Sequence, residues 1–198
     1  MVIELPQRQF SGYIFDCDGT LADTMPLHYR AWARVVEESG GRFPEELFYS
    51  WGGRPSETIV ADLNATFGSA FGIVDTAERK EAYYYELLHE VRPIQAVVDI
   101  ALGLQGRAPL AVASGGYRRY VELTLDAIGL TGVFPVIVCA EDYEHGKPHP
   151  APFLETARRL GVPAGDCLVF EDSPAGLEAA RRAGMECVCI PPMERMAP

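Results

Sequence analysis

The chain has 198 residues, of which 48% are hydrophobic and 23% are charged, and its formal net charge is −11. This length fits one domain, or one domain with a small insert, and the composition is typical of a globular protein. An acidic surface repels phosphate backbones, so nucleic acid is disfavoured as a partner. The N-terminal segment lacks the pattern of a signal peptide, and no apolar stretch approaches the length of a membrane span. We expect a cytoplasmic protein without a membrane partner, either a monomer or a weak homodimer.

The cysteines indicate a reduced chain. No C-x-x-C pair occurs, and the odd number of cysteines argues against a disulfide framework. Each cysteine lies in or beside an apolar run, so we expect small buried side chains. The five are Cys17, Cys139, Cys167, Cys187 and Cys189.

Five short apolar runs predict the strands of a sheet. Each is rich in β-branched or aromatic residues and is bounded by Gly, Pro or charge, which is typical of strands buried on both faces. Helical patterns separate the later runs and end at glycines. The alternation predicts an α/β fold, a Rossmann-like parallel sheet with helices on both faces. The runs are 13–15, 110–113, 136–139, 167–170 and 187–190, and the helical patterns are 117–128, 150–160 and 174–183.

The segment 25–92 contains no comparable strand run, so it predicts a small helical cap inserted after the first strand. The α/β pattern resumes near Pro93. We therefore expect an α/β catalytic core made of residues 1–24 and 93–198, with residues 25–92 as the cap. Helical patterns in the cap cover 26–38, 56–67 and 75–90.

Two capping signals mark the expected starts of cap helices. Thr24 stands just before the pattern that begins at Pro26, where a hydroxyl often caps a helix and a proline is well tolerated. Asp75 and Glu78 have the spacing of a capping box. We therefore expect helix starts close to these residues.

Polar residues follow the predicted strands where these strands end. The first strand runs into Asp16-Cys17-Asp18-Gly19-Thr20, and the second into Ser114-Gly115-Gly116. Lys147 lies in the loop after the third strand, and Glu171-Asp172 ends the fourth. Because ligands bind at the carboxyl ends of the strands in an open parallel sheet, these residues should meet at one site.

The residue types at this edge suit the transfer of a phosphoryl group. Oxygen atoms from Asp16, Asp18 and Asp172 suit a hard cation such as Mg²⁺. Such a cation and the ammonium of Lys147 would offset the repulsion between a carboxylate and a phosphate dianion. Further hydrogen bonds to the phosphate would come from the backbone at Gly19 and the hydroxyl of Ser114.

The order and spacing of these segments resemble the four motifs of the haloacid dehalogenase superfamily. Residues 16–24, DCDGTLADT, resemble its first motif, and Ser114 matches the second. Lys147 in Gly-Lys-Pro matches the third motif, and Glu171-Asp172 matches the fourth. The resemblance covers nearly the whole chain and implies a Rossmann-like core with a helical cap after the first motif.

The same resemblance implies a role for each matching residue. Asp16 would be the nucleophile that forms an aspartyl phosphate. Asp18 would be the general acid for the leaving group and then the base that activates water. Mg²⁺ would be held by the side chains of Asp16 and Asp172 and the backbone carbonyl of Asp18, with Glu171 supporting these ligands from behind. Ser114 and Lys147 would hold the phosphoryl group.

Within the superfamily, the cap resembles that of the β-phosphoglucomutase and sugar-phosphatase branch. Thr24, His28 and Trp32 match its first cap helix, and Gly52-Gly53-Arg54-Pro55 resembles its specificity loop. Lys80 falls where this branch often has a cap lysine, although a solvated helix face is an equally good interpretation of that residue. The expected substrate contacts are Thr24, His28, Gly53, Arg54, Lys80 and Gly115.

One departure from the branch favours hydrolysis over mutase chemistry. Mutases of the branch have a lysine just before the loop glycine and an arginine shortly after it, where this chain has Gly52 and Ser56. We therefore expect a Mg²⁺-dependent phosphatase that hydrolyses a small phosphorylated metabolite, such as a sugar phosphate. A sugar-phosphate mutase is the alternative.

A non-catalytic binding module is disfavoured because every catalytic position is filled. A dehalogenase needs neither Mg²⁺ nor an acid at the position of Asp18 and is also disfavoured.

Overall fold

The computed structural model describes residues 3–192. Five parallel strands form one sheet in the order β3-β2-β1-β4-β5. All five predicted runs form strands, with boundaries that differ by one residue or not at all, and the predicted fold class is confirmed. The strands are β1 (Gly12–Phe15), β2 (Leu110–Ala113), β3 (Val136–Val138), β4 (Cys167–Glu171) and β5 (Glu186–Cys189).

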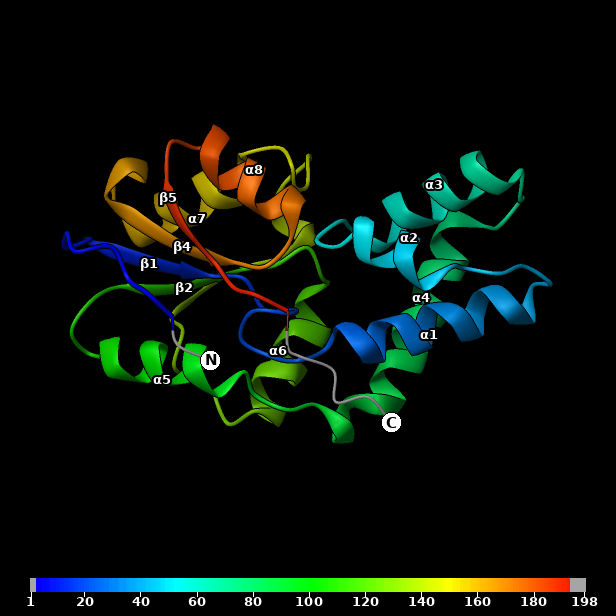
Figure 1. The fold of residues 1–198 in the computed structure, drawn as a ribbon, viewed down its shortest axis with the longest axis horizontal. Helices are drawn as coiled ribbons and strands as arrows, with labels where there is room; N and C mark the ends of the chain where they lie inside the picture. Colours follow the sequence, from blue (N-terminus) through cyan, green and yellow to red (C-terminus); the bar gives the residue numbers. More distant parts are fainter. Residues whose placement is uncertain (1–2, 193–198) are drawn as a thin grey trace.

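Two pairs of long helices cover the two faces of the sheet (Figure 1). Along β4, Leu168 and Phe170 pack into the apolar cluster on one face, and Cys167 and Val169 into the cluster on the other. Burial on both faces explains why the strands are continuous apolar runs. The first face carries α5 (Gln95–Leu104) and α6 (Arg118–Ala127), and the second carries α7 (Ala151–Leu160) and α8 (Pro174–Arg182). Short 3-10 helices are η1 (Leu88–Glu90), η2 (Ala140–Asp142) and η3 (Ala164–Asp166).

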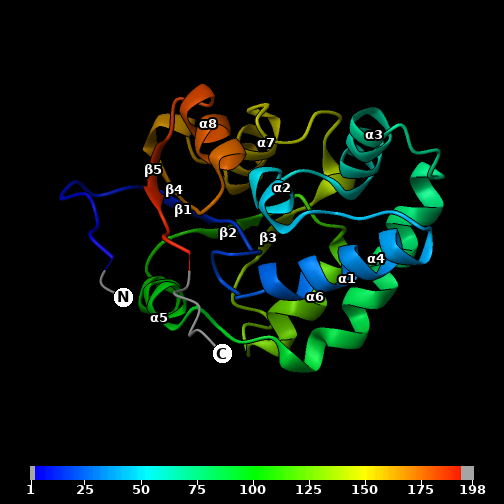
Figure 2. The same cartoon turned by 45° about the vertical axis from the view of Figure 1, so that its right-hand side comes forward.

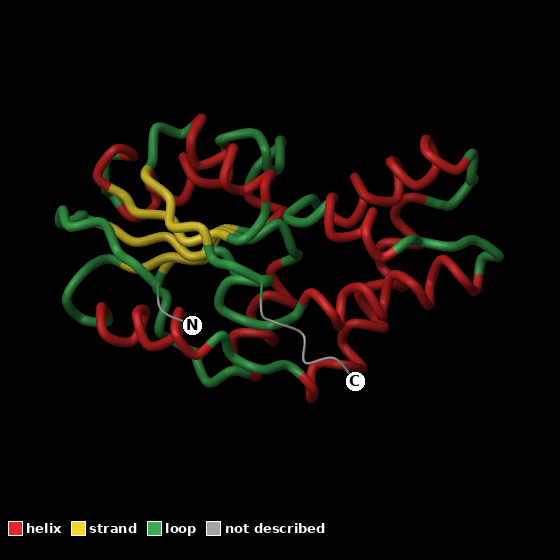
Figure 3. The backbone as a smooth tube through the Cα atoms, viewed as in Figure 1, coloured by secondary structure: helices red, strands yellow, loops and turns green. Residues whose placement is uncertain are grey.

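The segment between β1 and β2 is helical. Figures 1 and 2 show its α-helices beyond the carboxyl ends of the strands, and Figure 3 shows this part as helix and loop. These helices pack around an apolar cluster of their own that includes Trp32, Phe43, Phe48 and Leu63. The helices are α1 (Met25–Glu38), α2 (Glu45–Ser50), α3 (Ser56–Phe67) and α4 (Ile73–Leu87).

The predicted helix cap at Thr24 is wrong in its chemistry. Thr24 stands just before α1, but its side chain makes no capping hydrogen bond. Its hydroxyl donates instead to Asp18 Oδ1 at 2.7 Å.

The predicted capping box at the start of α4 is also wrong. The helix begins at Ile73, with Gly72 at the N-cap and no side-chain cap. Asp75 therefore lies within the first turn. At this position its charge interacts favourably with the helix dipole, so the acidic residue marks the helix start without capping it.

All five cysteines are free, as expected for a reduced chain, and a cytoplasmic location stays a prediction. Cys17, Cys139 and Cys167 are buried, and Cys187 is partly buried. The expectation of burial is wrong for Cys189, which is exposed because β5 is an outer strand with a neighbour on one side only. Within residues 3–192, no helix is both long and apolar enough to cross a membrane.

Candidate active site

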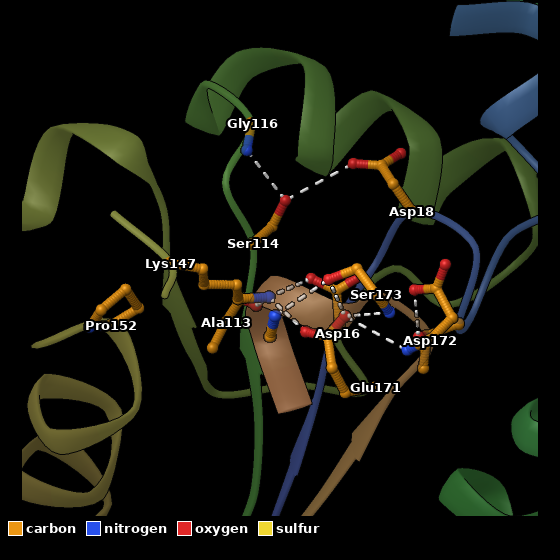
Figure 4. A network of polar contacts seen from close by, with 12 residues as sticks. Asp16, Asp18, Ala113, Ser114, Gly116, Lys147, Pro152, Glu171, Asp172 and Ser173 are labelled. Atoms are coloured by element: carbon orange, nitrogen blue, oxygen red, sulfur yellow. Dashed lines mark hydrogen bonds and ion pairs between the residues drawn. The ribbon is translucent and has the colours of Figure 1, made fainter. Parts of the chain in front are cut away.

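A buried lysine ties the ends of three strands together (Figure 4). Lys147 Nζ donates to Asp16 Oδ1 and to Glu171 Oε2, each at 2.6 Å, and to the carbonyl oxygen of Ala113 at 3.1 Å. The three ammonium protons therefore have three acceptors. Burial alone would lower the pKa of Lys147, but the carboxylates of Asp16 and Glu171 raise it above its ordinary value. Lys147 is thus a fixed cation.

Glu171 is engaged at both carboxylate oxygens. Oε2 accepts from Lys147, and Oε1 accepts from the backbone N–H groups of Asp172 and Ser173 and from the Ser173 hydroxyl. These bonds fix the backbone that carries Asp172. Glu171 therefore has the contacts of a residue that positions its neighbours, and its role behind the metal ligands stays a prediction.

The cluster holds more negative charge than positive charge. Burial and the nearby Glu171 carboxylate raise the pKa of Asp16 well above its ordinary value, despite the opposing effect of Lys147. Burial and Glu171 likewise raise the pKa of Asp172 to about 7. Three carboxylates thus share one ammonium, and the site favours an additional cation.

The donor set fits a hard divalent cation. Asp16, Glu171 and Asp172 each offer an oxygen, and these atoms lie within 4.8 Å of one another. Gly19 has φ +84°, and a Cβ placed there would lie 2.3 Å from Asp172 Oδ2, so only glycine lets the backbone come this close. Oxygen ligands of this kind suit Mg²⁺.

Asp18 follows the same strand as Asp16, but its side chain has different partners. Its Oδ1 accepts from the Thr24 hydroxyl at 2.7 Å and lies 3.0 Å from His28 Nε2. Burial would raise the pKa of Asp18, but the His28 ring, the Thr24 hydroxyl and the Lys80 ammonium lower it to about 2. Asp16 and Asp18 thus have opposite pKa shifts, which is typical of two carboxylates with different catalytic tasks. In this arrangement Asp18 is an anion that can accept a proton.

Ser114 lies between the second strand and Asp18. Its Oγ accepts from the Gly116 backbone N–H at 3.0 Å and lies 3.5 Å from Asp18 Oδ2. The structure therefore brings all the core residues predicted from the motifs to one edge of the sheet. Their catalytic roles stay predictions.

A buried polar network continues from Asp18 into the helical segment. Lys80 Nζ lies 2.8 Å from His28 Nδ1 and donates to Glu81 Oε1 at 2.9 Å. Because an ammonium can only donate, Nδ1 accepts, and the ring proton on Nε2 faces Asp18. The ring also stacks on Tyr84, with the centroids 3.9 Å apart. The alternative that Lys80 lies on a solvated helix face is wrong. Lys80 is only 3% exposed, because it lies on the face of α4 that packs against α1.

A cavity of about 70 Å³ lies between the sheet edge and the helical segment. The two walls touch closely, since a Cβ on Gly115 would lie 2.8 Å from the carbonyl oxygen of Gly53. Arg54 lines the cavity and forms an ion pair with Asp62 at 2.6 Å. Of the predicted site residues, Asp16, Asp18, His28, Gly53, Arg54, Lys80 and Gly115 line the cavity, whereas Thr24, Ser114, Lys147 and Asp172 lie outside its lining.

Sequence reasoning missed some residues that line this cavity. Glu81 is the charged residue among those missed, and the helical spacing of the apolar residues around it could have indicated its position. Ala77 and Tyr84 are buried at helical spacing on either side of Lys80 and Glu81, which indicates that both charged residues lie on the inner face of α4. Tyr84, Tyr120 and Thr124 are further lining residues.

Residues 13–190 match the haloacid dehalogenase-like hydrolase family. The chain belongs to this family, as the four motifs predicted. The match covers the sheet, its covering helices and the helical segment, so it includes every residue of the candidate site.

Two relatives with named activities are similar over most of their length. The chain is 36% identical over 186 residues to the fructose-1-phosphate phosphatase YqaB of Escherichia coli (strain K12), covering 92% of this chain and 97% of the relative. It is 36% identical over 180 residues to the validoxylamine A 7'-phosphate phosphatase of Streptomyces hygroscopicus subsp. limoneus, covering 88% and 83%. The predicted enzyme class, a phosphoric monoester hydrolase, is confirmed by these matches.

A solved structure supports the predicted branch as well. The β-phosphoglucomutase of Clostridium difficile superposes with a TM-score of 0.82 at 25% identity, covering 90% of this chain and 83% of that chain. Together with the phosphatases above, this likeness confirms the β-phosphoglucomutase and sugar-phosphatase branch. The fold is therefore shared by hydrolases and a mutase. The mutase alternative is not favoured, since the relatives with named activities above are phosphatases.

Proposed function

We propose that this protein is a Mg²⁺-dependent phosphatase that hydrolyses a sugar phosphate through an aspartyl phosphate on Asp16. The observation that carries the proposal is the buried cluster in which Asp16, Glu171 and Asp172 outnumber the single cation Lys147, close to a cavity. The named relatives support a phosphorylated carbohydrate as the substrate class.

We propose that residues 25–92 act as a cap over the catalytic core formed by the rest of the chain. Two observations support this division. The helical segment has an apolar cluster of its own, and the cavity lies between it and the sheet edge. At about 70 Å³ the cavity is much smaller than the roughly 300–1,000 Å³ of ligand pockets, so we expect the cap to move away when a sugar phosphate enters.

The residues that would hold Mg²⁺ are Asp16 and Asp172 through their side chains and Asp18 through its backbone carbonyl. When bound, the ion supplies positive charge that offsets the repulsion between the Asp16 carboxylate and the substrate phosphate. Glu171 keeps Asp172 in place through its backbone hydrogen bonds. Lys147 holds Asp16 with a 2.6 Å hydrogen bond, which orients the nucleophile.

In the first step, an Asp16 carboxylate oxygen forms a bond to phosphorus while the bond from phosphorus to the sugar oxygen breaks. The electron pair of that bond stays on the sugar oxygen, which takes a proton from Asp18. This step needs protonated Asp18, which must first exchange its hydrogen bonds from Thr24 and His28 for the sugar oxygen. In the second step, Asp18 takes a proton from water as the water oxygen attacks phosphorus and frees Asp16.

The first test is phosphate release from a panel of sugar phosphates and nucleotide phosphates, with Mg²⁺ and with excess chelator. We expect hydrolysis of at least one sugar monophosphate, a fall of at least about tenfold in chelator, and recovery when Mg²⁺ returns. Full activity in chelator would contradict the metal assignment. Turnover that requires a bisphosphate and releases no phosphate would instead support the mutase.

A second test separates the two proton transfers assigned to Asp18. Asp18→Ala should lower kcat/KM for a sugar phosphate by roughly 100-fold, because general acid–base catalysis is commonly worth about 10²–10⁴. With 4-nitrophenyl phosphate the first step should fall less than about tenfold, because the leaving phenolate needs little protonation. Rapid-quench measurement of the first turnover with both substrates checks this result. Equal losses in that turnover would show that Asp18 is not the general acid.

A further inference from the structure

The cavity has an acidic residue on its cap side. Glu81 on α4 lines the cavity, and its side chain is 5% exposed. Its Oε1 accepts from Lys80 Nζ at 2.9 Å and from the Ser56 hydroxyl at 2.7 Å. Among the described residues, no hydrogen-bond partner is found for Oε2. This oxygen can therefore accept a hydrogen bond from a molecule in the cavity.

The cations that line the cavity are already paired with acids. The Lys80 ammonium is paired with Glu81, and the Arg54 guanidinium with Asp62 at 2.6 Å. His28 is held between Asp18 and Lys80. Within residues 3–192, the cavity lining thus offers no unpaired lysine or arginine to a second anionic group of a substrate.

These contacts determine which substrates suit the cap side of the cavity. A carboxylate accepts hydrogen bonds, and a sugar hydroxyl can donate them. A phosphate dianion or a carboxylate has no proton to donate to Glu81, and its own negative charge would find no cation there because Lys80 is already paired. The cap side of the cavity therefore favours a neutral, hydroxyl-bearing group.

We propose that Glu81, together with Ser56, determines substrate choice by selecting phosphomonoesters whose other end carries hydroxyls and by excluding those with a second phosphate or a carboxylate. This inference rests on the proposed phosphatase function and adds a substrate class to it. Asp16 and its neighbours recognise the phosphoryl group, whereas Glu81 recognises the opposite end of the molecule.

Glu81→Gln tests the charge with little change of shape. The amide oxygen can still accept from Lys80 and Ser56, while the negative charge is lost. Lys80 then becomes an unpaired cation beside the cavity, so a second phosphate gains a partner that Glu81 occupies in the wild type. Glu78→Gln is the matched control, because it removes one negative charge from an exposed position of the same helix.

The measurement is kcat/KM for fructose 1-phosphate divided by kcat/KM for fructose 1,6-bisphosphate, repeated with glucose 1-phosphate and glucose 1,6-bisphosphate. We expect the wild type to prefer the monophosphate at least tenfold. Glu81→Gln should lower this ratio by at least about tenfold, which corresponds to about 1.4 kcal/mol, and Glu78→Gln should leave it within about twofold. A partly unfolded preparation lowers both rates equally, so the ratio is independent of the folded fraction.

Ser56→Lys offers a second route to the same result, because it adds a cation next to Glu81 and should also lower the ratio. An unchanged ratio in both variants, or a wild type that hydrolyses both esters equally well, would overturn the inference while leaving the phosphatase proposal intact. Absence of phosphate release from every ester by the wild type would instead contradict the phosphatase proposal itself.

Discussion

Asp16→Asn is expected to lower kcat by at least about a thousandfold, because an amide cannot attack phosphorus and the covalent route is lost. The fold should remain, since the amide oxygen can still accept the hydrogen bond that Lys147 donates to Asp16. The measurement is steady-state phosphate release from the best sugar phosphate, with circular dichroism as the check on folding. Residual activity above about a hundredth of wild type would remove Asp16 as the nucleophile.

The same variant has a predictable effect on stability. Burial and Glu171 raise the pKa of Asp16, so its charged form is disfavoured in the folded protein. A carboxyl whose pKa is higher in the folded state than in the unfolded state destabilises the fold at a pH where it is ionised. In the absence of Mg²⁺, the Tm of Asp16→Asn should therefore be no lower than that of wild type. For the fall in kcat predicted above, the control is Asp75→Asn at an exposed position of α4, which should keep kcat within about twofold.

The core was predictable from local pattern because its strands are buried on both faces. The runs 110–113 and 167–170, which form β2 and all but the last residue of β4, are apolar at every position, and the residues that follow them match the motifs in order. Carboxyl ends of parallel strands necessarily share an edge, so the meeting of Asp16, Ser114 and Asp172 followed from topology. The distances could not be predicted, since they depend on the tertiary contacts of Lys147.

The helical segment 25–92 was harder to predict, for physical reasons. Helix α2 has six residues, too few to show a helical period, and it is held by the packing of Phe48 against Phe43. The burial of Lys80 depends on two partners. His28 lies on another helix, α1, and Glu81 is the next residue along α4. A charged residue on a helix looks solvated until its partners are known, and the partners of Lys80 come from the tertiary fold.

Lys147→Met should strongly destabilise the fold. The lysine side chain is 0% exposed and lies 2.6 Å from both Asp16 and Glu171. Removing one partner of a buried ion pair commonly costs about 3–5 kcal/mol, because the remaining charge is buried without compensation. We expect a fall of this size in the free energy of unfolding, measured by urea denaturation at pH 7 without Mg²⁺. Arg107→Met, at an exposed position, should change it by less than about 0.5 kcal/mol.

A double variant distinguishes the charge effect from the loss of packing. If uncompensated carboxylates cause the damage, Lys147→Met combined with Glu171→Gln should be more stable than Lys147→Met alone, because one of the unpaired charges is removed as well. The amide that replaces the Glu171 carboxylate can still accept from the backbone N–H groups of Asp172 and Ser173, so those bonds are kept. If Lys147→Met were as stable as Arg107→Met, the ammonium would not be balancing a charged cluster. The electrostatic reason for a cation at this site would then fail, whatever the activity of the variant.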